Sequence, residues 1–361
     1  MVAWFFKSTI NSMSENSSGW VINGHKVINK SRIWYVGVLK GVVSVLIISI
    51  ILMVVIKSPY IKVSTGPVHA ARIEKADFVN SKVTISYPTV QVSSLSWLEY
   101  FWENSRGTLL VKGEVTKSPE GLLDMWLSKS IAWSVAGNIL MQPNVITEGV
   151  IVTEIIPGGW GERNRIQVGD VIVAVGVKPI KSINDYNTYL NADELKLTSE
   201  KRKLLIQRFS EYKKVLLPTI GNALNSKTPK NLGIKVALNK NFSIPEVDIP
   251  SGNIGGPSGG VVNTLLYLEY RSGSKLLNGK NIVGTGEITS EGAVLPVAGI
   301  PEKLKGAEEE KADVFILPAG GAQVASSDTT IKILKINTIE EAIRWLCLNG
   351  GKAKICPAYI L

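Results

Sequence analysis

The chain has 361 residues, a formal net charge of +10, 45% hydrophobic residues and 19% charged residues. This length predicts two or three domains, and the composition allows buried cores. The lysines and arginines are scattered, and no short window is Arg-rich with interleaved aromatic residues. The charge therefore argues against a nucleic-acid partner and favours a basic surface beside an anionic membrane.

Metal and nucleotide sites are not indicated by any motif. No CxxC or HExxH pattern occurs, and the only histidines are His25 and His69, so we expect neither a metal nor another cofactor. The Gly-Lys pairs at 279–280 and 351–352 are not followed by Ser or Thr, so neither is a P-loop. We therefore expect no built-in ATPase.

Residues 33–56 form an apolar run that predicts a transmembrane helix. A cleaved signal peptide is the alternative, but the run is long and no small-x-small cleavage site follows it. Basic residues outnumber acidic ones in residues 1–32, which predicts a cytoplasmic tail there and places the remainder outside the cell. The charged residues of this tail are Lys7, Lys26, Lys30 and Arg32 against Glu15.

Residues 57–143 are expected to form an extracytoplasmic juxtamembrane region. The stretch "SKVTISYPTVQV" (81–92) is typical of a strand. The stretch "SLSWLEYFWE" (94–103) carries aromatic residues at helical spacing. We expect this aromatic stripe to pack in a core or at the membrane interface, and not to form a binding surface.

Residues 144–222 are expected to form a small β-rich domain. A strand from about Thr147 leads to a turn at Pro157-Gly158-Gly159, then to "VGD", a strand "VIVAV" and a helix from Ser182. The stretches "KRKLLIQRF" and "KKVLLPTI" predict a hairpin around Ser210-Glu211-Tyr212.

This order of elements resembles a PDZ domain of the type found in bacterial proteases. The resemblance places Glu148-Gly149-Val150 at the loop that receives a peptide C-terminus and Gly169-Asp170 at a turn before the next strand. It implies that an extended peptide binds by adding a strand to an exposed edge. The alternative is a β-rich spacer without a ligand.

Residues 232–347 are expected to form the last domain, which begins with "LGIKVAL" and alternates strands and helices in a mixed α/β or α+β order. Its loop "GGPSGG" places Ser258 where a glycine-rich segment meets an apolar helix. A serine needs a base to become a nucleophile. We expect His25 on the opposite side of the membrane and His69 just outside the span, which leaves a lysine or a carboxylate.

The loop is followed by "GTGEITSEGAVLPVAGIPEKLKGA" (284–307). Together the two motifs resemble the proteolytic domain of the Lon family, in which a serine and a lysine form a catalytic dyad. The resemblance implies that Ser258 is the nucleophile, that Lys303 is the base, and that Thr285 hydrogen-bonds the lysine. The differences from the family pattern are Gly259, Ala298 and Pro301, and none of them removes a catalytic group.

As a whole the chain resembles the PDZ-containing, membrane-anchored Lon-like serine proteases of Gram-positive bacteria. The implied fold class is α+β, with an N-terminal transmembrane helix, a PDZ-like β-rich domain and a Lon-type α/β proteolytic domain. Free N–H groups at the helix start beside Ser258 are expected to stabilise an oxyanion. For Lys303 to act as a base, burial must lower its pKa from about 10.4.

The expected function is that of an ATP-independent, single-pass serine endopeptidase of the bacterial cell membrane, with its catalytic domain outside and its PDZ-like domain presenting or gating substrates. The expected partners are peptides or small proteins, the lipid bilayer and a second copy of the chain. The alternatives are a non-enzymatic peptide-binding membrane scaffold and an esterase or amidase for small substrates. Cys347 and Cys356 are expected either to form a disulfide or to be two free thiols.

Overall fold

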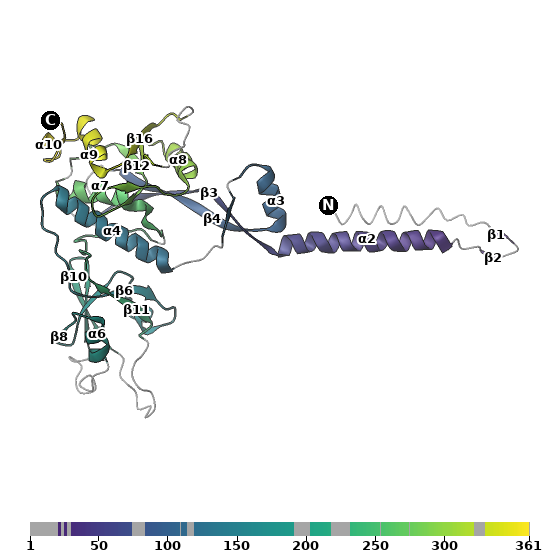
Figure 1. Cartoon of the computed structure of the whole chain (residues 1–361), viewed down its shortest axis with the longest axis horizontal. Helices are drawn as coiled ribbons and strands as arrows, with labels where there is room; N and C mark the ends of the chain where they lie inside the picture. The colour runs from purple at the N-terminus through teal and green to yellow at the C-terminus, as the bar shows by residue number, and fades with distance from the viewer. Residues whose placement is uncertain are drawn as a thin grey trace, which may run out of the picture. The chain divides into compact units, whose positions relative to one another are not determined.

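The structure is a computed structural model that describes residues 21–22, 25–26, 30–73, 84–108, 110–113, 119–190, 203–217, 232–252, 254–273, 275–320 and 329–360. The chain divides into two compact units, Met1–Tyr60 with Ser94–Lys112 and Ile61–Ser93 with Gly113–Leu361. Helices and strands are mixed through both units, which confirms the predicted α+β class (Figure 1).

The first unit is dominated by the long apolar helix α2 (Lys30–Val55). Its segment Gly37–Val55 is long and apolar enough to cross a membrane, and none of that segment is buried inside the protein. The predicted span, residues 33–56, therefore coincides with this helix. The unit also contains a short strand pair, β1 (Val21–Ile22) with β2 (His25–Lys26).

Two further elements complete the first unit, α3 (Trp97–Ser105) and β5 (Leu110–Lys112). The helix α3 is the one expected from the aromatic spacing. It begins with a capping box, in which the Ser96 side chain accepts from the backbone N–H of Glu99 and the Glu99 side chain accepts from the backbone N–H of Ser96. None of the residues of α3 is buried, so its aromatic side chains are not core residues.

The second unit contains a six-stranded sheet in the order β10-β9-β7-β6-β11, with β8 paired to β7. Helix α6 (Ile183–Leu190) contributes Tyr186 and Leu190 to the core of this sheet, and a short helix α5 (Trp160–Arg163) follows the predicted turn at 157–159. The strands are β6 (Gly149–Ile155), β7 (Val171–Val175), β8 (Lys178–Pro179), β9 (Lys203–Arg208), β10 (Glu211–Leu216) and β11 (Ile234–Asn239).

Most of this sheet agrees with the sequence-based expectation, but its last strand does not. The hairpin β9–β10 is present, with the turn at Phe209-Ser210, just before the predicted position. The stretch "LGIKVAL" was expected to begin the last domain. In the structure its residues from Ile234 onward form β11, which pairs antiparallel with β6. The alternation of apolar and polar residues in this stretch predicts a strand, but it does not predict the strand with which it pairs.

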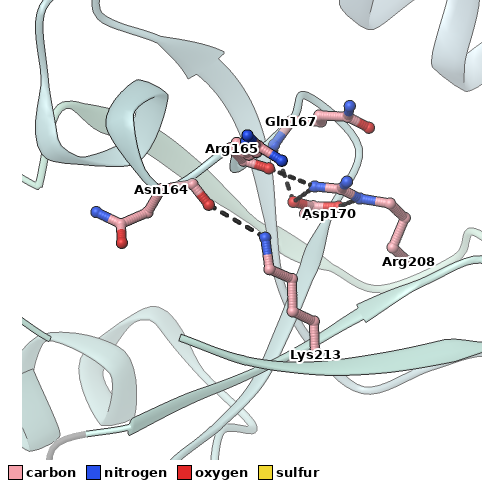
Figure 2. A network of polar contacts seen from close by, with 6 residues as sticks. All are labelled: Asn164, Arg165, Gln167, Asp170, Arg208 and Lys213. Carbon is pink, nitrogen blue, oxygen red and sulfur yellow. Dashed lines mark hydrogen bonds and ion pairs between the residues drawn. The ribbon is translucent and has the colours of Figure 1, made fainter. Parts of the chain in front are cut away.

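The "VGD" turn is held by a buried carboxylate (Figure 2). Arg208 donates from Nε to Oδ1 of Asp170 at 2.6 Å and from Nη2 to Oδ2 at 2.7 Å, and the backbone N–H of Gln167 donates to Oδ2 at 2.9 Å. Arg208 also donates to the carbonyl of Arg165, and Lys213 donates to that of Asn164. The hydrogen bonds to Asp170 raise the pKa of Arg208. Asp170 therefore links the hairpin to the turn before β7.

A second sheet in the same unit contains strands in the order β16-β15-β12-β4-β3. Strands β16, β15, β12 and β4 pair in parallel. The strands are β3 (Lys57–Ala71), β4 (Thr84–Ser96), β12 (Asn281–Gly284), β15 (Val314–Pro318) and β16 (Lys332–Ile336).

Alternate residues of the central strands point to opposite faces of this sheet. Ile282 and Ile316 join the core formed with α4 (Pro119–Ile139), α7 (Gly260–Arg271) and α9 (Ile339–Leu348). Val283 and Phe315 join the core formed with α8 (Ile300–Glu309) on the other face. Helices therefore cover both faces of the sheet.

This sheet corrects the predicted boundaries of the last domain. Strand β4 pairs with β12, although it lies in the segment 57–143 that we expected to form a separate juxtamembrane region. Helix α4, from the same segment, packs in the core with α7. The domain expected to span residues 232–347 thus also contains segments that precede the first sheet in the sequence.

The C-terminal segment is tied back to α9. Cys347 and Cys356 are joined in a disulfide, which is one of the two alternatives expected from the sequence. Both cysteines are buried in the same core as α7, and the short helix α10 (Pro357–Ile360) follows.

Candidate active site

Ser258 lies in a short 3-10 turn, η2 (Pro257–Gly259), that leads directly into α7. The preceding residue Gly256 has φ = 90°, a conformation that favours glycine. Helix α7 is buried over most of its length, so the position of its first turn is fixed by the core. The sequence "GGPSGG" thus places a serine at the start of a rigid buried helix, as predicted.

Helix α4 supports the loop that carries the serine. The backbone N–H of Gly256 donates to the carbonyl of Gly121 at 2.8 Å, and the hydroxyl of Ser128 donates to the carbonyl of Pro257 at 3.2 Å. A Cβ at Gly255 would lie 3.1 Å from the backbone of Gly121, which is a tight contact. A side chain at position 255 would therefore press on α4, so the close approach of α4 to this loop favours glycine there.

Lys303 reaches the site from the first turn of α8. Its side chain is buried, with 4% of the residue exposed, and its Nζ donates to Oγ1 of Thr285 at 3.1 Å. Burial lowers the pKa of Lys303 from 10.5 to about 8. A substantial fraction of this amine is therefore neutral near pH 8.

Thr285 connects the lysine to the serine loop. It directly follows β12, its residue is 1% exposed, and its Oγ1 donates to the carbonyl of Ser258 at 3.3 Å. The backbone N–H of Gly286 donates to the same carbonyl at 2.8 Å, and that of Val261 donates to the carbonyl of Gly286 at 3.1 Å. Helices on opposite faces of the sheet therefore meet at the carboxyl end of β12.

Ser258 and Lys303 line one cavity of about 640 Å³. The structure thus brings together Ser258, Thr285 and Lys303, the three residues predicted from the sequence. Other walls of the cavity come from β3, β4 and α4, including His69, Tyr87, Val90 and Met125, together with the loop at 250–255. The residues of β3, β4 and α4 were not predicted as part of the site, because no sequence motif relates them to Ser258 and Lys303, which come much later in the chain.

His69 is the unexpected member of this cavity wall. From the sequence we expected His69 just outside the membrane span and did not expect it to act as the base. In the structure β3 carries it to the same cavity as Ser258. A histidine can also serve as a base, so any assignment of the base to Lys303 has to be tested against His69.

Two buried polar side chains lie close to Gly259, the residue after Ser258. The hydroxyl of Tyr87 and both amide atoms of Asn263 have no hydrogen-bond partner among the described residues. A Cβ on Gly259 would lie 3.3 Å from the Tyr87 ring and 3.5 Å from Nδ2 of Asn263. Burial, with a smaller contribution from Asp248, raises the pKa of Tyr87 above its usual range, so the phenol is neutral and can only act as a dipole.

No group of three or more His, Cys, Asp or Glu side chains that could hold a metal ion occurs within the described ranges. The chemistry that this arrangement of residues supports is acid–base and nucleophilic. A serine hydroxyl, a buried amine of lowered pKa and the first N–H groups of a helix are the components of acyl transfer.

The peptide-binding loop expected at Glu148-Gly149-Val150 is only partly as predicted. Gly149 starts β6, and Glu148 borders a cavity of about 390 Å³ that is also lined by Lys181 and Lys240. Strand β6 pairs with β11 on one side and with β7 on the other. Both sides of β6 are therefore occupied, and the expected addition of a peptide strand at another edge of the domain stays a prediction.

Two family models match stretches of the second unit. Residues 198–343 match the family model of the Lon protease (S16) C-terminal proteolytic domain, and residues 133–206 match that of the PDZ domain. The first match begins before β9, β10 and β11, which the structure places in the other sheet.

Two relatives are similar to part of the chain. The chain is 34% identical over 107 residues to Lon protease 1 of Sorangium cellulosum (strain So ce56), which covers 27% of this chain and 13% of that protein. It is 28% identical over 128 residues to Lon protease of Clostridium beijerinckii (strain ATCC 51743 / NCIMB 8052), which covers 34% of this chain and 15% of that protein. The matched part thus spans a small fraction of both relatives.

Proposed function

We propose that this chain, which carries a Lon-type proteolytic domain and a PDZ domain, is a serine endopeptidase with Ser258 as nucleophile and Lys303 as base. One observation carries the proposal. The buried amine of Lys303 is held by Thr285, whose hydroxyl also contacts the backbone of Ser258, and the lysine and the serine line one cavity.

The proposed reaction passes through an acyl-enzyme. Oγ of Ser258 attacks the carbonyl carbon of the peptide bond, and its proton moves to the neutral Nζ of Lys303. The oxygen of the tetrahedral intermediate accepts hydrogen bonds from the backbone N–H groups of Ser258 and Gly259 in η2, which stabilise its negative charge. The next two N–H groups, of Gly260 and Val261, already donate to the carbonyls of Pro257 and Gly286. The Lys303 ammonium then gives its proton to the leaving amine. In the second half, water attacks the acyl group while Lys303 accepts the proton of the water, and Lys303 then returns that proton to Oγ of Ser258.

The base is proposed to be Lys303 because of its environment. Position 303 is buried and its pKa is lowered to about 8. A base whose pKa lies near the working pH can accept a proton and return it, each with only a small free-energy cost. An exposed lysine with an ordinary pKa would be protonated at neutral pH and could not act in this role.

The proposal extends to location and to the handling of substrates. Helix α2 would anchor the protein in the cell membrane with residues 1–32 in the cytoplasm and the catalytic site outside. The PDZ domain would present or gate substrates, and the cavity bordered by Lys181 and Lys240 suits a carboxylate. No P-loop sequence occurs in these 361 residues, and we propose that cleavage of extended peptides needs no ATP.

The test is cleavage of a defined peptide library by the purified full-length protein in nanodiscs, without nucleotide, with products identified by mass spectrometry. We expect the wild type to cleave internal bonds and Ser258→Ala to be inactive. A wild type that cleaves nothing while binding peptides would support the scaffold alternative. Hydrolysis of small esters without peptide cleavage would support the esterase alternative.

A further inference from the structure

The exposed face of α3 is an apolar stripe on a helix that starts at the outer end of α2. Leu98, Phe101 and Trp102 are 45%, 53% and 60% exposed. Their spacing of three and four residues places them side by side on one face. A surface helix of a soluble protein normally turns such a face inward, so this face lacks a partner.

Helix α3 is rigidly attached to the end of the proposed span. The backbone N–H of Trp97 donates to the carbonyl of Ile56 at 3.3 Å, directly after α2 ends. The rings of Tyr60 and Tyr100 stack with centroids 4.5 Å apart, and the capping box at Ser96 fixes the first turn. Figure 1 shows α3 beside the C-terminal end of α2.

The polar groups of α3 lie away from the stripe or at its end. Glu99 is used by the capping box, and Glu103 accepts a hydrogen bond from Thr108 at 2.7 Å. The guanidinium of Arg106 lies over the ring of Trp102 at 4.6 Å. The stripe thus presents apolar and aromatic groups, with one positive charge at its edge, where lipid phosphates would be attracted.

We propose that α3 lies in the interfacial region of the bilayer that α2 crosses, with Leu98, Phe101 and Trp102 facing the acyl chains. This inference rests on the proposed membrane anchoring. We choose lipid as the occupant because Trp97, the first residue of α3, hydrogen-bonds Ile56, the residue directly after α2. A helix held at the end of the span lies at the depth of the lipid surface. Tryptophan and arginine at that depth are the residues that interfaces favour.

The test uses spin labels on the full-length protein in nanodiscs that contain anionic lipid. The variants Trp102→Cys and Phe101→Cys report on the stripe, Ile48→Cys on α2, and Tyr212→Cys, at a residue 62% exposed in β10, is the matched aromatic control. The native cysteines are joined in a disulfide and leave the introduced thiol as the labelling site. Power saturation then compares accessibility to oxygen, which enters lipid, with accessibility to a water-soluble nickel chelate.

We expect the ratio of oxygen to nickel accessibility at positions 101 and 102 to lie between the low value at 212 and the high value at 48. Labels at 101 and 102 that are as aqueous as the label at 212, with position 48 in lipid, would overturn the proposal and leave the anchor intact. Shielding of both positions from both reagents would mean that protein covers the stripe, which also overturns it. An aqueous label at 48 would contradict the anchor itself.

Discussion

The burial that suits Lys303 to its proposed role as a base has a cost in stability. Its pKa is lowered from 10.5 to about 8 by burial, and at 1.36 kcal/mol per pKa unit this corresponds to about 3 kcal/mol of destabilisation at neutral pH. The folded state binds fewer protons than the unfolded state between these two pH values. Stability from this group therefore rises with pH in that window and is lowest below pH 8.

The first prediction follows from the direction in which stability changes with pH. Lys303→Met keeps the apolar bulk and removes the charge, so we expect it to be more stable than the wild type by up to about 3 kcal/mol at pH 7. The advantage should shrink between about pH 8 and pH 10.5. Urea denaturation of both proteins at pH 7 and pH 10 measures it. If the difference in stability between the two proteins were the same at pH 7 and pH 10, burial of the charged lysine would not be what destabilises the wild type.

Thr285 is predicted to position the amine and not to react itself. Its hydroxyl accepts from Lys303 and donates to the carbonyl of Ser258. Thr285→Ala should lower kcat about five- to thirtyfold, the equivalent of about 1–2 kcal/mol for one buried hydrogen bond, and should shift the pH dependence of cleavage. Thr285→Ser keeps the hydroxyl and should restore most of kcat. If the serine variant were as impaired as the alanine variant, packing by the methyl group would explain the loss.

At the scale of elements, the contact between α4 and the serine loop decides where Ser258 stands. Gly255 and Gly121 face each other, but a Cβ at 255 would lie 3.1 Å from the partner backbone whereas one at 121 would lie 3.5 Å away. We expect Gly255→Ala to displace the loop and lower kcat at least tenfold, since misplacement by a fraction of an ångström disturbs catalysis. Gly121→Ala is the matched control and should cleave peptides at close to the wild-type rate.

The outcome is read from kcat together with thermal unfolding. A loss of kcat in Gly255→Ala without a change in unfolding temperature would locate the effect in the loop. Equal activity of the two alanine variants would contradict the view that α4 fixes the position of the nucleophile.

In the PDZ sheet, the ion pair of Asp170 with Arg208 is predicted to be structural. Asp170 is 2% exposed and receives bonds from both the arginine and the backbone of the turn. Asp170→Ala leaves the guanidinium without its partner and should cost about 3 kcal/mol of stability. Glu154→Ala removes the exposed pair with Lys235 in the same sheet and should cost less than about 1 kcal/mol. Similar losses in both variants, measured by chemical denaturation, would contradict this distinction.

For the whole molecule, the sequence predicted features that depend on neighbouring residues. The apolar run, the β9–β10 hairpin and the start of α7 all follow from local patterns. Ser258, Thr285 and Lys303 were predicted because the two motifs that contain them resemble the Lon proteolytic domain, and the structure places all three together.

The features that could not be predicted depend on pairing between distant segments. Strand β4 pairs with β12 across about 200 residues, and β11 closes the PDZ sheet. Each of these strands has an ordinary strand pattern, and such a pattern carries no information about its partner. His69 was set aside for the same reason, because only the position of β3 in the sheet brings it to the cavity.

The central claim is that Lys303, and not His69, activates Ser258. The most direct measurement is the rate of peptide cleavage against pH for the wild type, Lys303→Met and His69→Gln, each shown to be folded. We predict that the wild-type rate rises through about pH 8, the pKa to which burial lowers Lys303, because the neutral amine is the active form. His69→Gln should keep this profile and Lys303→Met should be inactive at every pH. Cleavage by a folded Lys303→Met variant, or a wild-type profile that rises near pH 6.5 and is lost in His69→Gln, would contradict the account.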